Sequence, residues 1–422
     1  MRRVREFTSA ARWRLWAALS CLVITASVVG PPDAQAAATK TAAPVVGALS
    51  PTAPNPHPPL GAKAPDGSVP GGSRLAGRGL ILPAGARKLP ANLTARSWVL
   101  SDLDTGQVLA ARDPHGRYQP ASILKILTTV TILPQLPGRK VVTVSRLAAS
   151  AEGSAVGLLA GAKYTVDELF RALLLVSAND AAAALAEANG GISRTVAEMN
   201  SEAGALGGYD TFVQTPSGLD GWQQLTSAYD MSLFLRAALH QPRFAAYDRT
   251  VSGTFPPKKS HYGAVGGYQF DNQSLDFFQS VPGALVAKTG FTDAAQHTYV
   301  AAAERHGRRL GIVFLRNRRA PLDQYQQAAA LFDWGFALPA ATKAVGMLAG
   351  PISAADRSSG PSQPSATPLG GSAPAAAAVH LSAANPGLDR GRIAVTAGGA
   401  GLLAVAGVVT LRRRRRRSRR QY

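Results

Sequence analysis

Two strand-turn-strand patterns stand at opposite ends of one patterned region, and they constrain the fold more than any other feature. The first reads "RSWVLSDL", then a "DTG" turn at Asp104, then "QVLAAR". The second reads "HTYVAAAE", "RHGR" and "RLGIVFL". Apolar runs of this length around a tight turn are typical of β-hairpins. Because helical patterns fill the region between them, the sequence predicts an α+β fold, with one antiparallel sheet built from both ends and covered by helical layers.

The helical patterns between the hairpins carry recognisable start and stop signals. Residues 165–168, "TVDE", form a capping box ahead of "LFRALLLV". The stretch "SANDAAAALAEANGG" places Asn179 and Asp180 near a helix start and a Gly-Gly pair at its stop. We expect two more amphipathic helices over residues 193–206 and 227–240, and a closing helix in "PLDQYQQAAALFDWGF".

Composition separates this patterned region from its flanks. Residues 37–90 and 339–391 are rich in Pro, Ala, Gly and Ser and lack periodic apolar positions. Such segments bury too little apolar surface to fold alone, so we expect both to be extended linkers. Residues 91–338 then form a single catalytic domain of about 250 residues, which is long enough for a substantial core.

The two ends of the chain carry membrane-targeting patterns. Residues 1–36 combine five Arg, an apolar stretch and "AQA", which predicts a cleaved signal peptide; an uncleaved anchor is the alternative. Residues 393–411 are apolar and uncharged, and a helix of that length rises roughly 28 Å, about one hydrocarbon core. Residues 412–422 hold eight Arg, which favour the cytoplasmic side. We expect an exported, membrane-anchored protein with its catalytic domain outside the cytoplasm.

The net charge of +20 does not indicate a nucleic-acid partner, because much of it lies in these two terminal segments. The only cysteine, Cys21, falls within the predicted signal peptide, so the mature chain has no disulfide or Cys-based metal site. The seven His show no pair at metal-ligand spacing. We therefore predict neither a metal nor a cofactor.

Three short motifs carry the predicted chemistry. They are Ser122-Ile-Leu-Lys125, then Ser177-Ala-Asn179 and Lys288-Thr-Gly290, which begin 55 and 166 residues after Ser122. Each motif is common alone, and Ser-x-x-Lys alone is better explained by Lys125 as a solvated side chain at the edge of an apolar helix. Together and in this order, the three motifs indicate serine-based acyl transfer.

The physical chemistry of the motifs supports this interpretation. Residues i and i+3 of a helix share a face, so Lys125 can take the proton of a nucleophilic Ser122. Burial and a second cation, Lys288, would lower the pKa of Lys125 enough for it to act as a base. We expect Ser177 to relay protons, and Asn179 to hold a substrate amide or to position Lys125. We expect the third motif where a strand begins, with Lys288 and Thr289 able to bind a substrate carboxylate and Gly290 allowing a substrate backbone to pack closely.

At these motifs the chain resembles the D-alanyl-D-alanine carboxypeptidases among the low-molecular-mass penicillin-binding proteins. The resemblance extends to "SWVLSDLDTGQVLAARDP", "GAKYTVDELFRALLLVSANDAA", "TPSGLDG" and "TSAYDMSLFLRAAL". It implies a β-lactamase/transpeptidase-like fold, an acyl-enzyme at Ser122, and removal of the terminal D-alanine from peptidoglycan stem peptides. It also implies acylation by β-lactams, with the backbone N–H groups of Ser122 and Phe291 as the oxyanion hole. With Phe291 and Thr292, the predicted substrate-binding segment runs from Lys288 to Thr292.

The sequence departs from the family pattern in places and leaves alternatives open. Alanine replaces glycine in the second motif, and Phe291 stands where many members have histidine after Lys-Thr-Gly. A class A β-lactamase needs a glutamate to activate the deacylating water, but no Glu occurs between Glu202 and Glu304. A D,D-endopeptidase, or a catalytically silent muropeptide-binding sensor on the same fold, remains an alternative.

Overall fold

The computed structural model describes residues 61–348. The predicted signal peptide, apolar span and basic tail lie outside these residues, as does part of each predicted linker. Among the helices of residues 61–348, none is long and apolar enough to cross a membrane.

The centre of the fold is a seven-stranded antiparallel sheet that joins both ends of the described region, as the two hairpins predicted. The strand order is β1-β3-β2-β12-β11-β10, and β13 pairs with β3. The first hairpin, β2–β3, lies against the second, β11–β12, through the β2–β12 pairing, with Val99 opposite Val313. The sheet strands are β1 (Leu80–Ile81), β2 (Ser97–Asp102), β3 (Gln107–Arg112), β10 (Ala284–Thr292), β11 (Gln296–Arg305), β12 (Arg308–Asn317) and β13 (Gly346–Met347).

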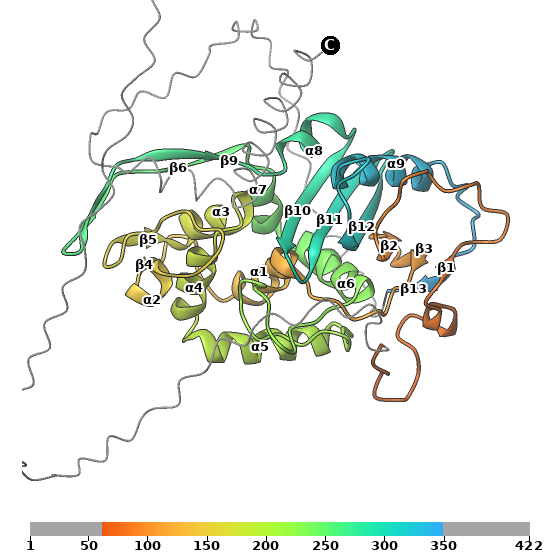
Figure 1. Cartoon of the computed structure of the whole chain (residues 1–422), viewed down its shortest axis with the longest axis horizontal. Coiled ribbons are helices and arrows are strands. Elements are labelled where there is room, and N and C mark those ends of the chain that lie inside the picture. The colour runs from red at the N-terminus through yellow and green to blue at the C-terminus, as the bar shows by residue number, and fades with distance from the viewer. Residues whose placement is uncertain (1–60, 349–422) are drawn as a thin grey trace, which may run out of the picture. The chain divides into compact units, whose positions relative to one another are not determined.

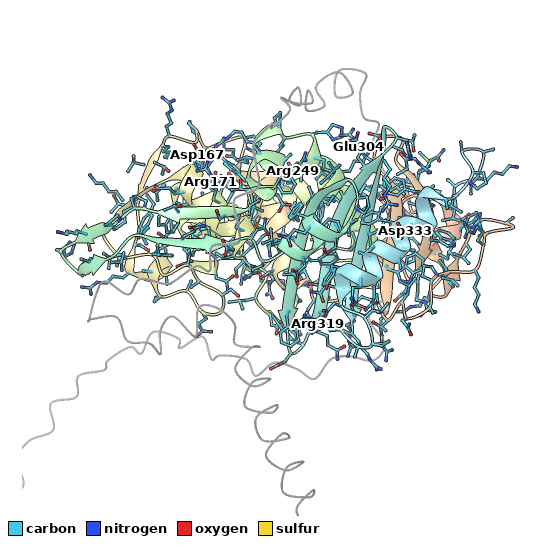
Figure 2. All side chains as sticks on the ribbon, turned by 90° about the horizontal axis from the view of Figure 1, so that it is seen from above. Asp167, Arg171, Arg249, Glu304, Arg319 and Asp333 are labelled. Atoms are coloured by element: carbon cyan, nitrogen blue, oxygen red, sulfur yellow. The ribbon has the colours of Figure 1, made fainter. Side chains whose placement is uncertain are left out.

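The sheet has a buried core on each face, because alternate residues of a strand point to opposite sides. Val99 and Val313 belong to the core that also contains residues of α1, α3, α4 and α6. Trp98 and Phe314 belong to the other core, which α8 and α9 complete. Figure 1 shows α9 beside β11 and β12, and Figure 2 labels Asp333 on this helix. With both faces covered, the strands read as nearly continuous apolar runs.

The predicted helices form where their start signals stand. Thr165 and Glu168 make the reciprocal hydrogen bonds of a capping box, and the Ser227 side chain caps α6. The helices are η1 (Ser73–Ala76), η2 (Ala121–Leu124), α1 (Lys125–Ile132), α2 (Arg146–Ala149), α3 (Val166–Leu175), α4 (Asn179–Ala188), α5 (Ile192–Ala205), α6 (Ala228–Leu239), α7 (Pro242–Asp248), α8 (Leu275–Ser280) and α9 (Gln324–Phe336).

Three two-stranded ribbons complete the architecture. In Figure 1 the β6–β9 ribbon extends from the body of the domain, on the same side as β4 and β5. Lys258, beyond β6, forms an ion pair with Glu168 on α3, with 3.1 Å between Nζ and Oε1. The ribbon strands are β4 (Val141–Thr143) with β5 (Lys163–Thr165), β6 (Ser252–Phe255) with β9 (Tyr268–Asp271), and β7 (Lys258–Ser260) with β8 (Gly263–Val265).

The structured part of the chain extends further than composition predicts. Residues 61–90 were expected to be linker, yet they contain η1 and β1, and Leu75 is fully buried. Near residue 348, Met347 lies in a segment that was also expected to be linker, yet it pairs with Gln107 of β3. Composition does not predict these contacts, because single apolar residues, rather than a periodic pattern, hold the segments against the domain.

Candidate active site

The nucleophile candidate Ser122 and the base candidate Lys125 meet at the start of α1. Ser122 lies in the 3₁₀ turn η2, and Lys125 is the first residue of α1. The Nζ of Lys125 is 2.9 Å from the Oγ of Ser122. Lys125 is fully buried, which contradicts the alternative of a solvated lysine at a helix edge.

The surroundings of Lys125 favour its neutral form. Burial lowers the pKa of Lys125 well below its usual value, and the positive charge of Lys288 lowers it further, whereas Asp180 opposes this shift. A neutral amine has a lone pair that can accept a proton from a serine hydroxyl. The two causes that the motifs predicted, burial and a second cation, are therefore both present.

The second motif leads from α3 into α4: Ser177 lies on the connection, and Asn179 is the first residue of α4, near the helix start that the sequence predicts. The Oδ1 of Asn179 is 2.7 Å from the Nζ of Lys125, and its Nδ2 donates to the carbonyl of Glu152 at 2.6 Å. Ser177 has a φ of 62°, in the left-handed region that residues with a Cβ rarely adopt. Its Oγ is buried and has no hydrogen-bond partner within residues 61–348. Such backbone strain next to an unpartnered hydroxyl is typical of functional sites.

A loop that the motifs did not single out completes the lysine's surroundings. The carbonyl of Ser217 accepts from the Nζ of Lys125 at 2.7 Å. Gly218 follows with a φ of +87°, and a Cβ at this position would lie 2.0 Å from the carbonyl oxygen of Ala121. Only glycine therefore allows this loop to approach the nucleophile turn so closely.

The third motif brings β10 against the same turn. A Cβ on Gly290 would lie 2.8 Å from the backbone nitrogen of Ser122 and 2.5 Å from the Oγ1 of Thr298. The glycine thus permits close packing against the nucleophile turn itself, whereas the sequence had suggested close packing against a substrate backbone. The motif also lies in the later part of β10, not at the beginning of the strand as expected.

Comparisons with known proteins identify the family of this chain. The sequence model of peptidase family S11, D-alanyl-D-alanine carboxypeptidase, matches residues 84–318. The chain belongs to this family. It is 40% identical over 262 residues to the D-alanyl-D-alanine carboxypeptidase DacB2 of Mycobacterium tuberculosis, covering 61% of this chain and 87% of that one.

Two further likenesses show how widely the S11 resemblance extends. A crystal structure of a D-alanyl-D-alanine carboxypeptidase from Mycobacterium tuberculosis H37Rv superposes with a TM-score of 0.59 at 40% identity, covering 64% of this chain and all of that one. DacF of Bacillus subtilis is 30% identical over 250 residues, which span 57% of this chain and 62% of DacF. These relatives confirm the predicted family and the core of the predicted fold class, a sheet with helical layers.

Lys288, the first residue of the third motif, is buried, and among residues 61–348 it forms no hydrogen bond to the first or second motif. Its Nζ donates to the carbonyl of Thr289 at 2.8 Å, and burial lowers its pKa to about 8. The Nζ of Lys288 and the Oγ of Ser177 are not hydrogen-bonded to each other. Hydrogen bonds thus join Ser122, Lys125 and Asn179. The hydroxyl of Ser177 and the amine of Lys288 can still form further hydrogen bonds.

The remaining predicted substrate-binding residues occupy different positions on β10. The Thr289 hydroxyl lies 3.4 Å from the Nε2 of Gln324 on α9. The Phe291 side chain is 49% exposed, and its ring centroid is 4.6 Å from that of His297. Thr292 donates to Asp220 at 2.7 Å and so ties β10 to the loop that contains Ser217.

Two buried aspartates near the site had no assigned role in the sequence motifs. Asp180 accepts hydrogen bonds from the backbone N–H groups of Val156, Gly157 and Leu158, and so fixes the loop that Asn179 also holds. Asp248, the last residue of α7, accepts from the backbone N–H of Ala287. The position of Asp180 next to Asn179 could have identified it from the sequence, whereas Asp248 lies in a segment without a motif.

A third buried cluster lies apart from the motifs. One ligand-type atom from each of His115, Asp210 and Asp230 lies within 4.8 Å of the others. His115 Nδ1 is 2.7 Å from Asp210, and its Nε2 is 3.0 Å from the carbonyl of Pro70. Both ring nitrogens of His115 therefore lie within hydrogen-bond distance of an oxygen atom. Sequence spacing missed this cluster because its members are far apart in the chain; we assign it a role in docking residues 61–72.

Proposed function

We propose that this protein is a serine-type D-Ala-D-Ala carboxypeptidase that removes the terminal D-alanine from peptidoglycan stem peptides. The observation that carries the proposal is the 2.9 Å contact between Lys125 Nζ and Ser122 Oγ, with the lysine fully buried. A sensor that only binds muropeptides does not need a neutral lysine beside a serine. Membership of the S11 family supplies the substrate class.

The proposed reaction has two steps. Lys125 takes the hydroxyl proton of Ser122, whose Oγ attacks the carbonyl carbon of the penultimate D-alanine. The oxyanion that develops accepts from the backbone N–H groups of Ser122 and Phe291. The C–N bond then breaks, the amine of the terminal D-alanine gains a proton, and an ester remains on Ser122. Water hydrolyses this ester and restores the serine.

The geometry of β10 supports the proposed substrate pose. The N–H and C=O groups of Ala287 bond to Asp248 and Ser274 rather than to β11. Hydrogen-bonding direction alternates along a strand, so Thr289 and Phe291 direct their backbone groups to the same outer edge. An extended peptide can pair with such an edge. Lys288 and Thr289 are then in place to receive the substrate's terminal carboxylate.

The test combines product release with covalent trapping. We expect the wild-type protein to release D-alanine from a diacylated D-Ala-D-Ala peptide, and benzylpenicillin to add one drug mass to the peptide containing Ser122. Ser122→Ala should stay folded and show neither. An adduct on Ser177, or none on folded wild-type protein, would contradict the proposal. Rapid turnover of the drug without a lasting adduct would favour a β-lactamase, and preferential cleavage of crosslinked dimers would favour an endopeptidase.

We also propose that the protein is exported and anchored by residues 393–411, with residues 412–422 in the cytoplasm. The apolar span and the Arg run that follows it support this topology. Protease added to spheroplasts should digest the catalytic domain and spare an epitope placed after Tyr422. Protection of the domain would contradict the proposed orientation.

A further inference from the structure

Asp248 is a buried carboxylate beside the third motif, at the outer edge of β10. It is fully buried, and its Oδ2 accepts from the backbone N–H of Ala287 at 3.0 Å. Ser274 donates to the carbonyl of Ala287 at 3.0 Å. Both polar groups of the peptide unit just before Lys288 are thus held by side chains.

A hydrogen bond alone does not explain an aspartate at this position. Asparagine or serine would accept from the same N–H without bringing a charge into the core. The second oxygen of Asp248, Oδ1, is buried and has no partner in the part of the chain that the structure describes. Burying a carboxylate with an unpartnered oxygen is destabilising. The negative charge is therefore explained only if a neighbouring group is stabilised by it.

The charged and titratable groups around Asp248 identify that neighbour. Asp248 interacts electrostatically with Lys288 on β10 and with the phenol of Tyr299 on β11. Lys288 in turn acts on Lys125 of α1, which also interacts with Asp180 of α4. Asp248 and Lys288 do not form a direct ion pair among residues 61–348, so their attraction acts through the low-dielectric interior.

We propose that the negative charge of Asp248 keeps Lys288 cationic, and that Lys288 in turn keeps Lys125 in the neutral, proton-accepting form. Asp248 is then a positioning residue that acts through Lys288 and touches neither substrate nor nucleophile. The proposal deepens the proposed function and rests on it. It explains why a charged residue stands where a neutral acceptor would satisfy Ala287.

The directions of the titration shifts agree with this arrangement. Burial lowers the pKa of Lys288 to about 8, and Asp248 acts against that shift. Burial raises the pKa of Asp248 to about 7, and Lys288 acts against that shift. Each group thus favours the charged form of the other. Loss of the carboxylate charge lets Lys288 lose its proton at a lower pH, which weakens carboxylate binding and removes the repulsion that keeps Lys125 neutral.

The test is the pH profile of Asp248→Asn, measured both as kcat/KM for D-alanine release and as the rate of benzylpenicillin acylation. Asparagine keeps the acceptor for Ala287 and removes only the charge. We expect the alkaline limb, near pH 8 in the wild type, to move to lower pH by about one unit, so that activity on that limb falls about tenfold. Ser274→Ala, which removes the other contact to Ala287, should lower the melting temperature and leave the limb in place.

The outcomes separate this inference from the proposed function. A folded Asp248→Asn protein with the wild-type pH profile, or with activity lowered equally at every pH, would overturn the role of the charge and leave the carboxypeptidase assignment intact. A wild-type protein that neither releases D-alanine nor reacts with benzylpenicillin would overturn the proposed function itself. If Asp248→Asn does not fold, Asp248→Ser repeats the comparison with a smaller neutral acceptor.

Discussion

The Nζ of Lys125 lies 2.7 Å from the Oδ1 of Asn179, slightly closer than the 2.9 Å that separate it from the Oγ of Ser122. Asn179 is itself held by the carbonyl of Glu152. The amine is therefore aimed at the serine by an amide that is fixed at its other end. Mutations of these residues should therefore lower the rate of acylation more than they lower the stability of the fold.

Replacing the base should abolish acylation. Lys125→Ala removes the proton acceptor of Ser122, and loss of a general base lowers rates by about 10²–10⁴-fold. Lys259→Ala, which removes an exposed lysine of β7, should acylate at the wild-type rate. The measurement is stopped-flow acylation by a chromogenic β-lactam. Acylation of Lys125→Ala within a few-fold of wild type would show that another group takes the proton.

Asn179→Ala should slow acylation by about 10²-fold, because small displacements of a catalytic group are costly. The serine and lysine remain, so the adduct should still form at Ser122 after long incubation. Intact-mass spectrometry against time gives both the rate and the final extent. An unchanged rate would mean that the carbonyl of Ser217 is sufficient to position the lysine.

Gly218→Ala tests the close approach of the Ser217 loop. The added methyl group meets the carbonyl of Ala121, so the loop must move and Ser217 loses its contact with Lys125. Gly85→Ala is a matched control, since Gly85 has a φ of +69° but open space around its Cβ position. We expect Gly85→Ala to lose only about 1 kcal/mol of stability, and Gly218→Ala to lose more stability together with acylation. Equal melting temperatures would show that the backbone φ, not the contact, limits position 218.

The stability of the wild-type protein should carry a pH signature of Asp248. The folded pKa of about 7 lies above the ordinary 3.8, so between these values the folded protein holds a proton that the unfolded chain has released. Wild-type stability therefore falls as pH rises through this window, by up to about 4 kcal/mol. Asparagine does not titrate, so Asp248→Asn should gain stability relative to wild type from pH 4 to pH 8. Calorimetry that shows a constant difference would contradict the folded pKa.

Residues 61–90 should be needed for full stability. A fragment of residues 61–348 should melt at a higher temperature than a fragment of residues 91–348. The shorter fragment exposes the site of Leu75, worth about 1.5–3 kcal/mol, and leaves His115 without Pro70. Thermal unfolding of the two purified fragments measures the difference. Equal melting temperatures would show that these residues behave as the linker that composition predicts.

The sequence predicts the sheet, most helices and the three motifs because each has a local signal. The capping box at Thr165 and the hairpin turn at Asp104 are examples of such signals, which operate over a few residues. The same reasoning misses contacts that depend on the tertiary fold. The carbonyl of Ser217 and the carboxylate of Asp248 reach the site only after distant segments pack together. The resemblance includes "TPSGLDG", which contains Ser217, but assigns it no role, and Asp248 lies in a segment without a motif.

The pairing of β2 with β12 also determines when the domain can complete its folding. Arg308 of β12 bonds to Asp102 of β2 across a separation of 206 residues. Contacts this distant in sequence slow folding, because the chain must close a long loop before they form. As the chain is synthesised, the β2–β3 hairpin is made first, and the edge of β2 stays unpaired until β12 has been made. A chain that stops before β12 would keep that edge unpaired, and unpaired strand edges favour aggregation.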